Sequence, residues 1–72
     1  MKLTIESEYI RLDQALKLAN CVGGGGEAKM RVQEGEVLVD GVIELRRGRK
    51  LRPGMSFELD GEVIEVVAQS GE

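Results

Sequence analysis

The sequence contains no histidine, one cysteine and only two aromatic side chains, Tyr9 and Phe57. Without histidine, the chain lacks the commonest general base and metal ligand at neutral pH. The single Cys21 excludes an internal disulfide bond and has no second ligand at metal-site spacing. We therefore expect no metal and no cofactor, and a reducing cytoplasmic compartment is the natural location.

The remaining nucleophiles and acids do not suggest a catalytic site. The serines have no base at hand that would activate them. The carboxylates fall at outward strand positions and in turns, where we expect them to be solvated. We predict that the chain is not an enzyme and has no small-molecule substrate.

Long apolar runs are also missing. No stretch approaches the roughly 20 apolar residues that cross a bilayer, and residues 2–6 do not begin a run of signal-peptide length. No basic amphipathic helix supports binding to a membrane surface. We expect a soluble, intracellular monomer whose residues 1–72 form one small domain, with a mainly aliphatic core.

Charge is abundant but unevenly placed. The net charge is −3, yet residues 45–52 (LRRGRKLR) contain five basic residues and no acid, whereas five acids and no basic residue follow Pro53. Such segregation creates a local positive potential that the net charge hides. We name residues 46–52 the basic loop. They are either a binding site for an anionic partner or a solvated loop.

The first third of the chain predicts a strand and a helix. Residues 2–6 alternate, with Leu3 and Ile5 on one side. From residue 9 the period changes, and an apolar stripe predicts a helix of roughly three turns that Asn20 can end in a left-handed conformation. The stripe consists of Leu12, Ala15, Leu16 and Ala19.

A second, shorter helix of about ten residues is predicted from Glu27. Glu27 lies in its first turn, where a negative charge suits the helix dipole. Ala28 and Val32 are one turn apart and can pack inward, and Gly35 can supply a left-handed stop.

The rest of the chain predicts antiparallel strands. Asp40-Gly41 and Asp60-Gly61 are strong hairpin signals, and Pro53-Gly54 favours another turn. The strands that these turns connect are expected at 36–39, 42–45, 55–59 and 62–68, with Met55, Phe57 and Leu59 facing inward and Ile64, Val66 and Ala68 sharing a face. The predicted fold class is α+β, with two short helices packed on a small, bent, mainly antiparallel sheet.

Four glycines, residues 23–26, precede the second predicted helix. Gly23, Gly25 and Ala28 satisfy the dinucleotide fingerprint G-x-G-x-x-A. That site requires a strand before the glycines and a βαβ unit, whereas here a helix precedes them. We interpret the glycines as the turn between the two helices.

The ordered features of residues 9–59 resemble the S4 RNA-binding domain. The family pattern runs R-L-D-x-x-L, then S-R-S-x-A-R-x-L-I-x-x-G-x-V-x-V-N-G, then L-x-x-G-D. Glycines replace the Ser-Arg-Ser segment, Asp40 replaces asparagine and is expected to be structural, and Met55 replaces the final aspartate. The matching residues are Arg11-Leu12-Asp13, Leu16, Ala28-Lys29, Val32, Gly35-Glu36-Val37, Val39-Asp40-Gly41, Leu51 and Gly54.

The resemblance implies an αL motif, in which two helices present basic side chains and backbone amides to structured RNA such as ribosomal or transfer RNA, and an association with the ribosome. Recognition is expected by shape, because two isolated aromatics do not form a stacking platform. Arg31 is equally consistent with a phosphate contact and with an exposed helix residue. The candidate RNA-binding residues are Arg11, Gly25, Gly26, Lys29, Arg31, Arg46, Arg47, Arg49, Lys50 and Arg52.

Two other functions remain open from the sequence. The basic loop would also suit a protein-interaction module with an acidic partner. A ubiquitin-like sulfur carrier shares the small size and the starting strand, but such carriers end in Gly-Gly and this sequence ends Ser70-Gly71-Glu72.

Overall fold

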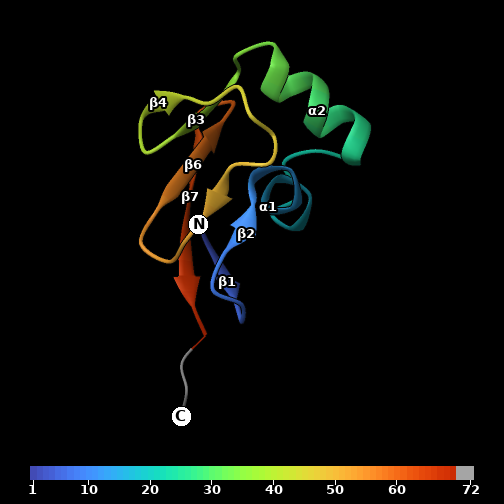
Figure 1. Cartoon of the computed structure of the whole chain (residues 1–72). Helices are drawn as coiled ribbons and strands as arrows, with labels where there is room; N and C mark the ends of the chain where they lie inside the picture. The colour runs from blue at the N-terminus through green and yellow to red at the C-terminus, as the bar shows by residue number, and fades with distance from the viewer. Residues whose placement is uncertain (70–72) are drawn as a thin grey trace.

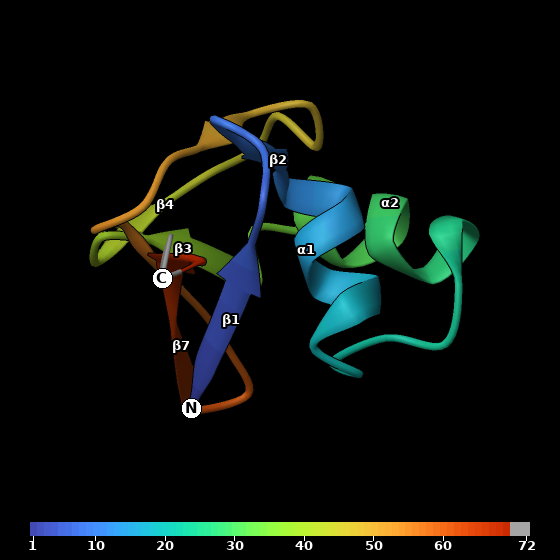
Figure 2. The same ribbon diagram turned by 90° about the horizontal axis from the view of Figure 1, so that it is seen from below.

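The structure, a computed structural model, describes residues 1–69. Two helices lie side by side on one flank of a five-stranded sheet (Figures 1 and 2). The elements are β1 (Lys2–Ile5), β2 (Ile10–Arg11), α1 (Leu12–Leu18), α2 (Gly25–Gln33), β3 (Val37–Val39), β4 (Val42–Ile43), β5 (Lys50–Leu51), β6 (Ser56–Leu59) and β7 (Glu62–Ala68).

The five-stranded sheet has the order β1-β7-β6-β3-β4. Its pairs β7–β6, β6–β3 and β3–β4 are antiparallel, and β1 joins the edge of β7 in parallel. A separate antiparallel ladder joins β2 to β5. The predicted α+β class, with a mainly antiparallel sheet, is confirmed; the parallel pair and the β2–β5 ladder were not predicted.

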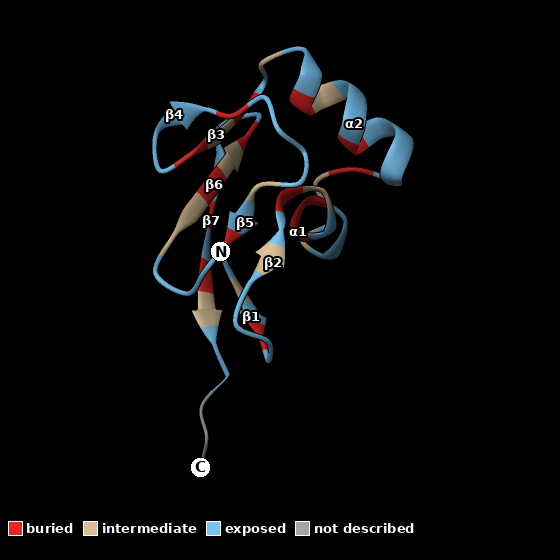
Figure 3. Ribbon diagram, in the orientation of Figure 1, coloured by how far each residue is buried: buried red, intermediate tan, exposed pale blue. Residues whose placement is uncertain are grey.

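The buried side chains form one aliphatic cluster around Phe57. Both helices contribute inward positions that their periodicity predicts, except that Ala19 is the C-cap of α1 and is only half-buried (Figure 3). Each fully buried large apolar side chain contributes about 1.5–3 kcal/mol relative to exposure. The helices supply Leu12, Ala15, Leu16, Ala28 and Val32, and the described strands supply Ile5, Val37, Val39, Leu51, Phe57, Leu59, Ile64 and Val66.

The predicted left-handed positions are confirmed. Asn20 has φ 60° after α1, and Gly35 has φ 76° after α2. Both Asp-Gly hairpins take positive φ at both central residues, as type I′ turns require. Asp40 is structural as expected, since its Oδ1 accepts a hydrogen bond of 2.9 Å from the backbone N–H of Ser56 on β6.

The helix boundaries differ from the prediction at two places. α1 has seven residues instead of three turns, because Ile10 and Arg11 form β2 and the helix begins only at Leu12. The prediction that all four glycines form the turn is wrong for Gly25 and Gly26, which form the first turn of α2. Gly24 is the N-cap, and the Glu27 carboxylate accepts a hydrogen bond of 2.8 Å from the N–H of Gly23, which closes this end of the helix.

The strand positions differ in smaller ways. β4 covers only Val42 and Ile43, and both side chains are exposed because β4 is a sheet edge. Ala68 is exposed at the end of β7, whereas Ile64 and Val66 are buried as predicted. Within residues 1–69, no helix has both the length and the apolar character needed to cross a membrane.

Candidate nucleic-acid interface

The basic loop is anchored to the start of α1. The backbone N–H groups of Leu12 and Asp13 donate to the carbonyl oxygens of Arg49 and Arg47, at 2.8 and 3.0 Å. The first amides of a helix have no partner within the helix, so the loop caps α1. The β2–β5 ladder adds a second anchor, in which Arg11 pairs with Lys50. Figure 2 shows the loop beside β2 and the beginning of α1. The fold therefore brings Arg11 next to the basic loop, although the sequence separates them.

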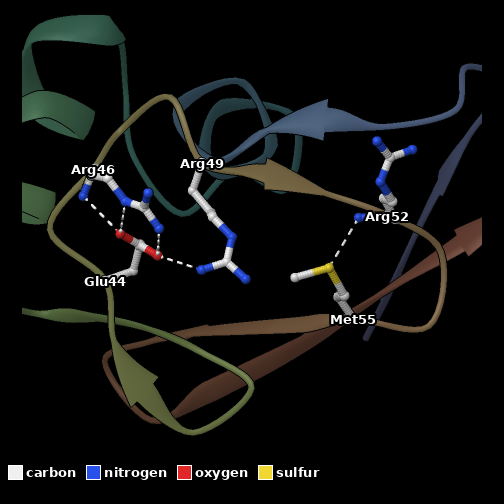
Figure 4. A network of polar contacts seen from close by, with 5 residues as sticks. All are labelled: Glu44, Arg46, Arg49, Arg52 and Met55. Carbon is white, nitrogen blue, oxygen red and sulfur yellow. Dashed lines mark hydrogen bonds and ion pairs between the residues drawn. The ribbon is translucent and has the colours of Figure 1, made fainter.

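Glu44 lies beneath the loop and holds two of its arginines (Figure 4). The carboxylate accepts hydrogen bonds from the backbone N–H and Nε of Arg46, both at 3.0 Å, and from Nη1 of Arg49 at 2.7 Å. Glu44 is only 7% exposed. The expectation that the carboxylates are solvated is wrong for this residue, because the arginines that follow it in the chain turn back and satisfy its charge.

These contacts lower the pKa of Glu44 from 4.5 to about 2, mainly through the hydrogen bond from the Arg46 side chain. A carboxylate whose pKa is lower in the folded state stabilises the fold above its unfolded pKa. Glu44 is therefore ionised at every physiological pH, and its arginine contacts do not change with pH there.

This gives a testable pH dependence. We expect the free energy of unfolding of the wild type to exceed that of Glu44→Gln by about 1–2 kcal/mol at pH 6, after allowance for solvent screening at the exposed arginines. The excess should persist above about pH 4.5 and disappear as the pH falls towards 2, where the carboxyl protonates in both states. Urea titrations of both proteins across this range measure it. A difference that stays constant from pH 6 to pH 2 would contradict the assignment.

The loop borders an open hollow of about 460 Å³ that is lined by Arg46, Gly48, Arg49 and Lys50. All the lining residues except the glycine carry a positive charge. A Cβ added at Gly48 would lie 3.7 Å from Nη2 of Arg11, which places the Arg11 guanidinium beside the same segment. A concave group of cations of this kind suits a phosphate.

Tyr9 borders the loop, and sequence reasoning did not assign it to the site. The Lys50 Nζ lies 4.8 Å from the centroid of its ring, and the Arg52 Cζ lies 5.8 Å from it. The backbone N–H of Arg52 donates to the sulfur of Met55 at 3.2 Å, so Met55 occupies the turn in which the S4 pattern has aspartate (Figure 4). The position of Tyr9 follows from the β2–β5 ladder, and two-residue strands leave no periodic signal in the sequence.

Arg31 is a candidate that the structure separates from the others. Its guanidinium contacts three carboxylates: that of Glu36, that of Asp60 at 2.6 Å and that of Glu27 at 3.8 Å. The side chain is 17% exposed, and its pKa is raised, first by the hydrogen bond to Asp60. Arg31 thus links α2 to the β6–β7 turn, and its positive charge is compensated by carboxylates of the protein itself.

Of the other α2 candidates, Gly25 and Gly26 begin the helix and Lys29 lies at its middle. Lys29 is exposed, and no hydrogen bond or ion pair within residues 1–69 links it to the basic loop. A Cβ added at Gly24, Gly25 or Gly26 would meet no atom within 4 Å. Gly25 and Gly26 are exposed and Gly24 is half-buried, and nothing within the described chain requires glycine there.

Comparison with known proteins decides the family. The S4 domain model matches residues 3–67, which is most of the chain. The chain belongs to the S4 domain family. This S4 domain is 46% identical over 59 residues to the probable ribosome maturation protein RlbA of Bacillus subtilis (strain 168), covering 82% of this chain and 83% of that protein. It is 35% identical over 60 residues to the putative RNA-binding protein YbcJ of Escherichia coli (strain K12), covering 83% and 86% of the two chains.

The fold of this S4 domain is also found in an experimental structure. The solution structure of YbcJ from E. coli, which reveals an αL motif involved in RNA-binding, superposes with a TM-score of 0.72 at 31% sequence identity. The superposition covers 93% of this chain and 86% of YbcJ. The resemblance on which the sequence interpretation depends is confirmed.

Proposed function

We propose that this chain is a non-catalytic RNA-binding protein that recognises structured RNA, either ribosomal or transfer RNA. The hollow of the basic loop is the observation that carries the proposal, because three cations line a concave surface that α1 and the β2–β5 ladder hold in place. The proposed contacts outside the loop are Arg11, Lys29 in the middle of α2, and the amides of Gly25 and Gly26 at the start of that helix. Arg31 acts in this proposal as a structural residue.

The names of the relatives support this direction. RlbA is named a probable ribosome maturation protein and YbcJ a putative RNA-binding protein. We propose that residues 1–72 act as one monomeric RNA-binding unit in the cytoplasm, and that ribosomal RNA is the first RNA to test.

The salt dependence of binding tests the proposal. Seven cations belong to the proposed interface, and two of them, Arg46 and Arg49, already share Glu44. We expect about five phosphates to be neutralised, which gives a slope of about −3.5 to −4.5 when log K is plotted against log salt. Filter binding of a structured ribosomal RNA fragment from about 50 to about 200 mM salt supplies the slope.

The same titration has a clear negative result. Absence of binding at the lowest salt, or a slope near zero, would overturn the proposed interface. Recovery of a defined acidic protein that stays bound after nuclease treatment would favour the interaction-module alternative instead.

A further inference from the structure

We propose that Tyr9 and the basic loop together form a site for one unpaired nucleotide, whose phosphate lies in the hollow and whose base stacks on the Tyr9 ring. This inference depends on the proposed RNA-binding function and makes it more specific. Tyr9 is 38% exposed, whereas the other aromatic residue, Phe57, is 1% exposed in the core. Tyr9 is thus the aromatic surface that the described chain offers to a ligand.

Lys50 connects the two parts of the site. It lines the hollow, and its Nζ also lies 4.8 Å from the centre of the Tyr9 ring. The backbone holds this arrangement, because Ile10 pairs with the buried Leu51 and the hydroxyl of Ser7 donates to the Tyr9 carbonyl at 2.8 Å. In a nucleotide the ribose joins the base to the phosphate. The hollow suits the phosphate, and the adjacent Tyr9 ring suits the base.

The cations beside the ring do not prevent stacking. A cation–π contact at an exposed site is worth roughly a factor of 2–5 in an equilibrium constant, whereas stacking of a base on an aromatic ring is worth roughly a factor of 5–100. A base therefore displaces a cation from the ring. The displaced Lys50 or Arg52 remains beside the nucleotide, where its charge pairs with a phosphate.

The site selects for RNA structure. The bases of a paired helix are stacked inside it, so only a bulged, looped or terminal base is available to Tyr9. Shape and phosphate contacts are then supplemented by one base contact, which differs from the sequence-based expectation of recognition by shape alone. One ring accommodates one base, so the preference is for an isolated unpaired nucleotide within an otherwise folded RNA.

The test compares three RNA hairpins of equal stem length: fully paired, with one bulged uridine, and with an abasic nucleotide at the bulge. We expect the wild type to bind the uridine bulge about 5- to 100-fold more tightly than the abasic bulge, which retains the phosphate but lacks the base. Tyr9→Leu should abolish this ratio, with a larger loss of affinity for the uridine bulge than for the paired hairpin. Tyr9→Phe, which retains the aromatic face, should preserve the ratio.

The tyrosine fluorescence of the wild-type protein provides a second test, which does not depend on whether the variants fold. The chain has one tyrosine and no tryptophan, so its tyrosine fluorescence reports on Tyr9 alone. We expect the uridine bulge to shorten the fluorescence lifetime of Tyr9 more than the abasic bulge does.

The outcomes separate this inference from the proposed function. Equal binding of the uridine and abasic bulges by the wild type, or equal losses of Tyr9→Leu on all three hairpins, overturns the nucleotide site but leaves RNA binding intact. Failure to bind any of the hairpins overturns both.

Discussion

Replacing Arg47 and Lys50 together by alanine is expected to weaken binding of structured RNA by at least about 100-fold, since each charged hydrogen bond to phosphate contributes about 1.5–3 kcal/mol. Both side chains are exposed, and neither forms an ion pair within residues 1–69. Their charges are therefore available to RNA. Loss of two phosphate contacts should also reduce the magnitude of the log–log salt slope by about 1.4–1.8.

The loop should keep its conformation in this variant, because its anchors are in the backbone. The Arg47 carbonyl accepts from Asp13, and the pairing of Lys50 with Arg11 is a ladder interaction between main chains. Filter binding over a series of salt concentrations measures both the affinity and the slope, and circular dichroism checks the fold.

A matched control separates the site from the net charge. Lys2→Ala/Lys17→Ala removes two positive charges from β1 and from the last turn of α1, outside the proposed interface. We expect this variant to keep nearly the wild-type affinity and slope. Equal losses in the two variants would show that only total charge matters, and a loop variant that binds as tightly as the wild type would exclude the basic loop as the site.

The parts of the fold that depend on local pattern were predictable. The stripe of Leu12, Ala15 and Leu16 reflects a helical period, and an Asp-Gly turn selects a tight hairpin wherever it stands. The ladder of β2 and β5 has no such signal, because two residues per strand do not establish a period and their pairing depends on the tertiary fold. The basic loop was therefore recognised by its charge but not by its conformation.

The candidate site also has features that the sequence predicts and features that depend on the tertiary fold. The candidate cations were evident from their clustering, but their availability depends on distant partners. Arg31 lies in α2 and forms an ion pair with Asp60, which is 29 residues away in the sequence. Glu44 follows an apolar pair at the edge of the sheet, a position that suggests solvent exposure, yet two arginines bury it. Tertiary contacts thus decide which charges are free.

Replacing Glu44 by glutamine is expected to weaken RNA binding by about 5- to 10-fold, although it removes a negative charge beside a polyanion. Long-range electrostatics alone predicts the opposite, because a carboxylate near the hollow repels phosphate. The carboxylate, however, positions Arg46 and Arg49 simultaneously. Glutamine lacks the charge for these contacts, so the two arginines are no longer held in place. We take the cost to RNA binding as that of about one hydrogen bond, roughly 1–1.5 kcal/mol, which gives the expected factor. Filter binding at one fixed salt concentration measures it.

Asp13→Asn is the control with the opposite expected sign. Asp13 also lies beside the basic loop, but its carboxylate pairs with the exposed Arg11 at 3.2 Å and holds no residue of the loop. Its neutralisation should leave RNA binding unchanged or strengthen it, because Arg11 becomes available to phosphate while the backbone N–H at residue 13 still donates to the Arg47 carbonyl. If both substitutions strengthen binding, Glu44 acts only as a repelling charge and does not position the loop. If Glu44→Gln weakens binding and Asp13→Asn does not, the buried carboxylate is what gives the arginines of this interface their binding geometry.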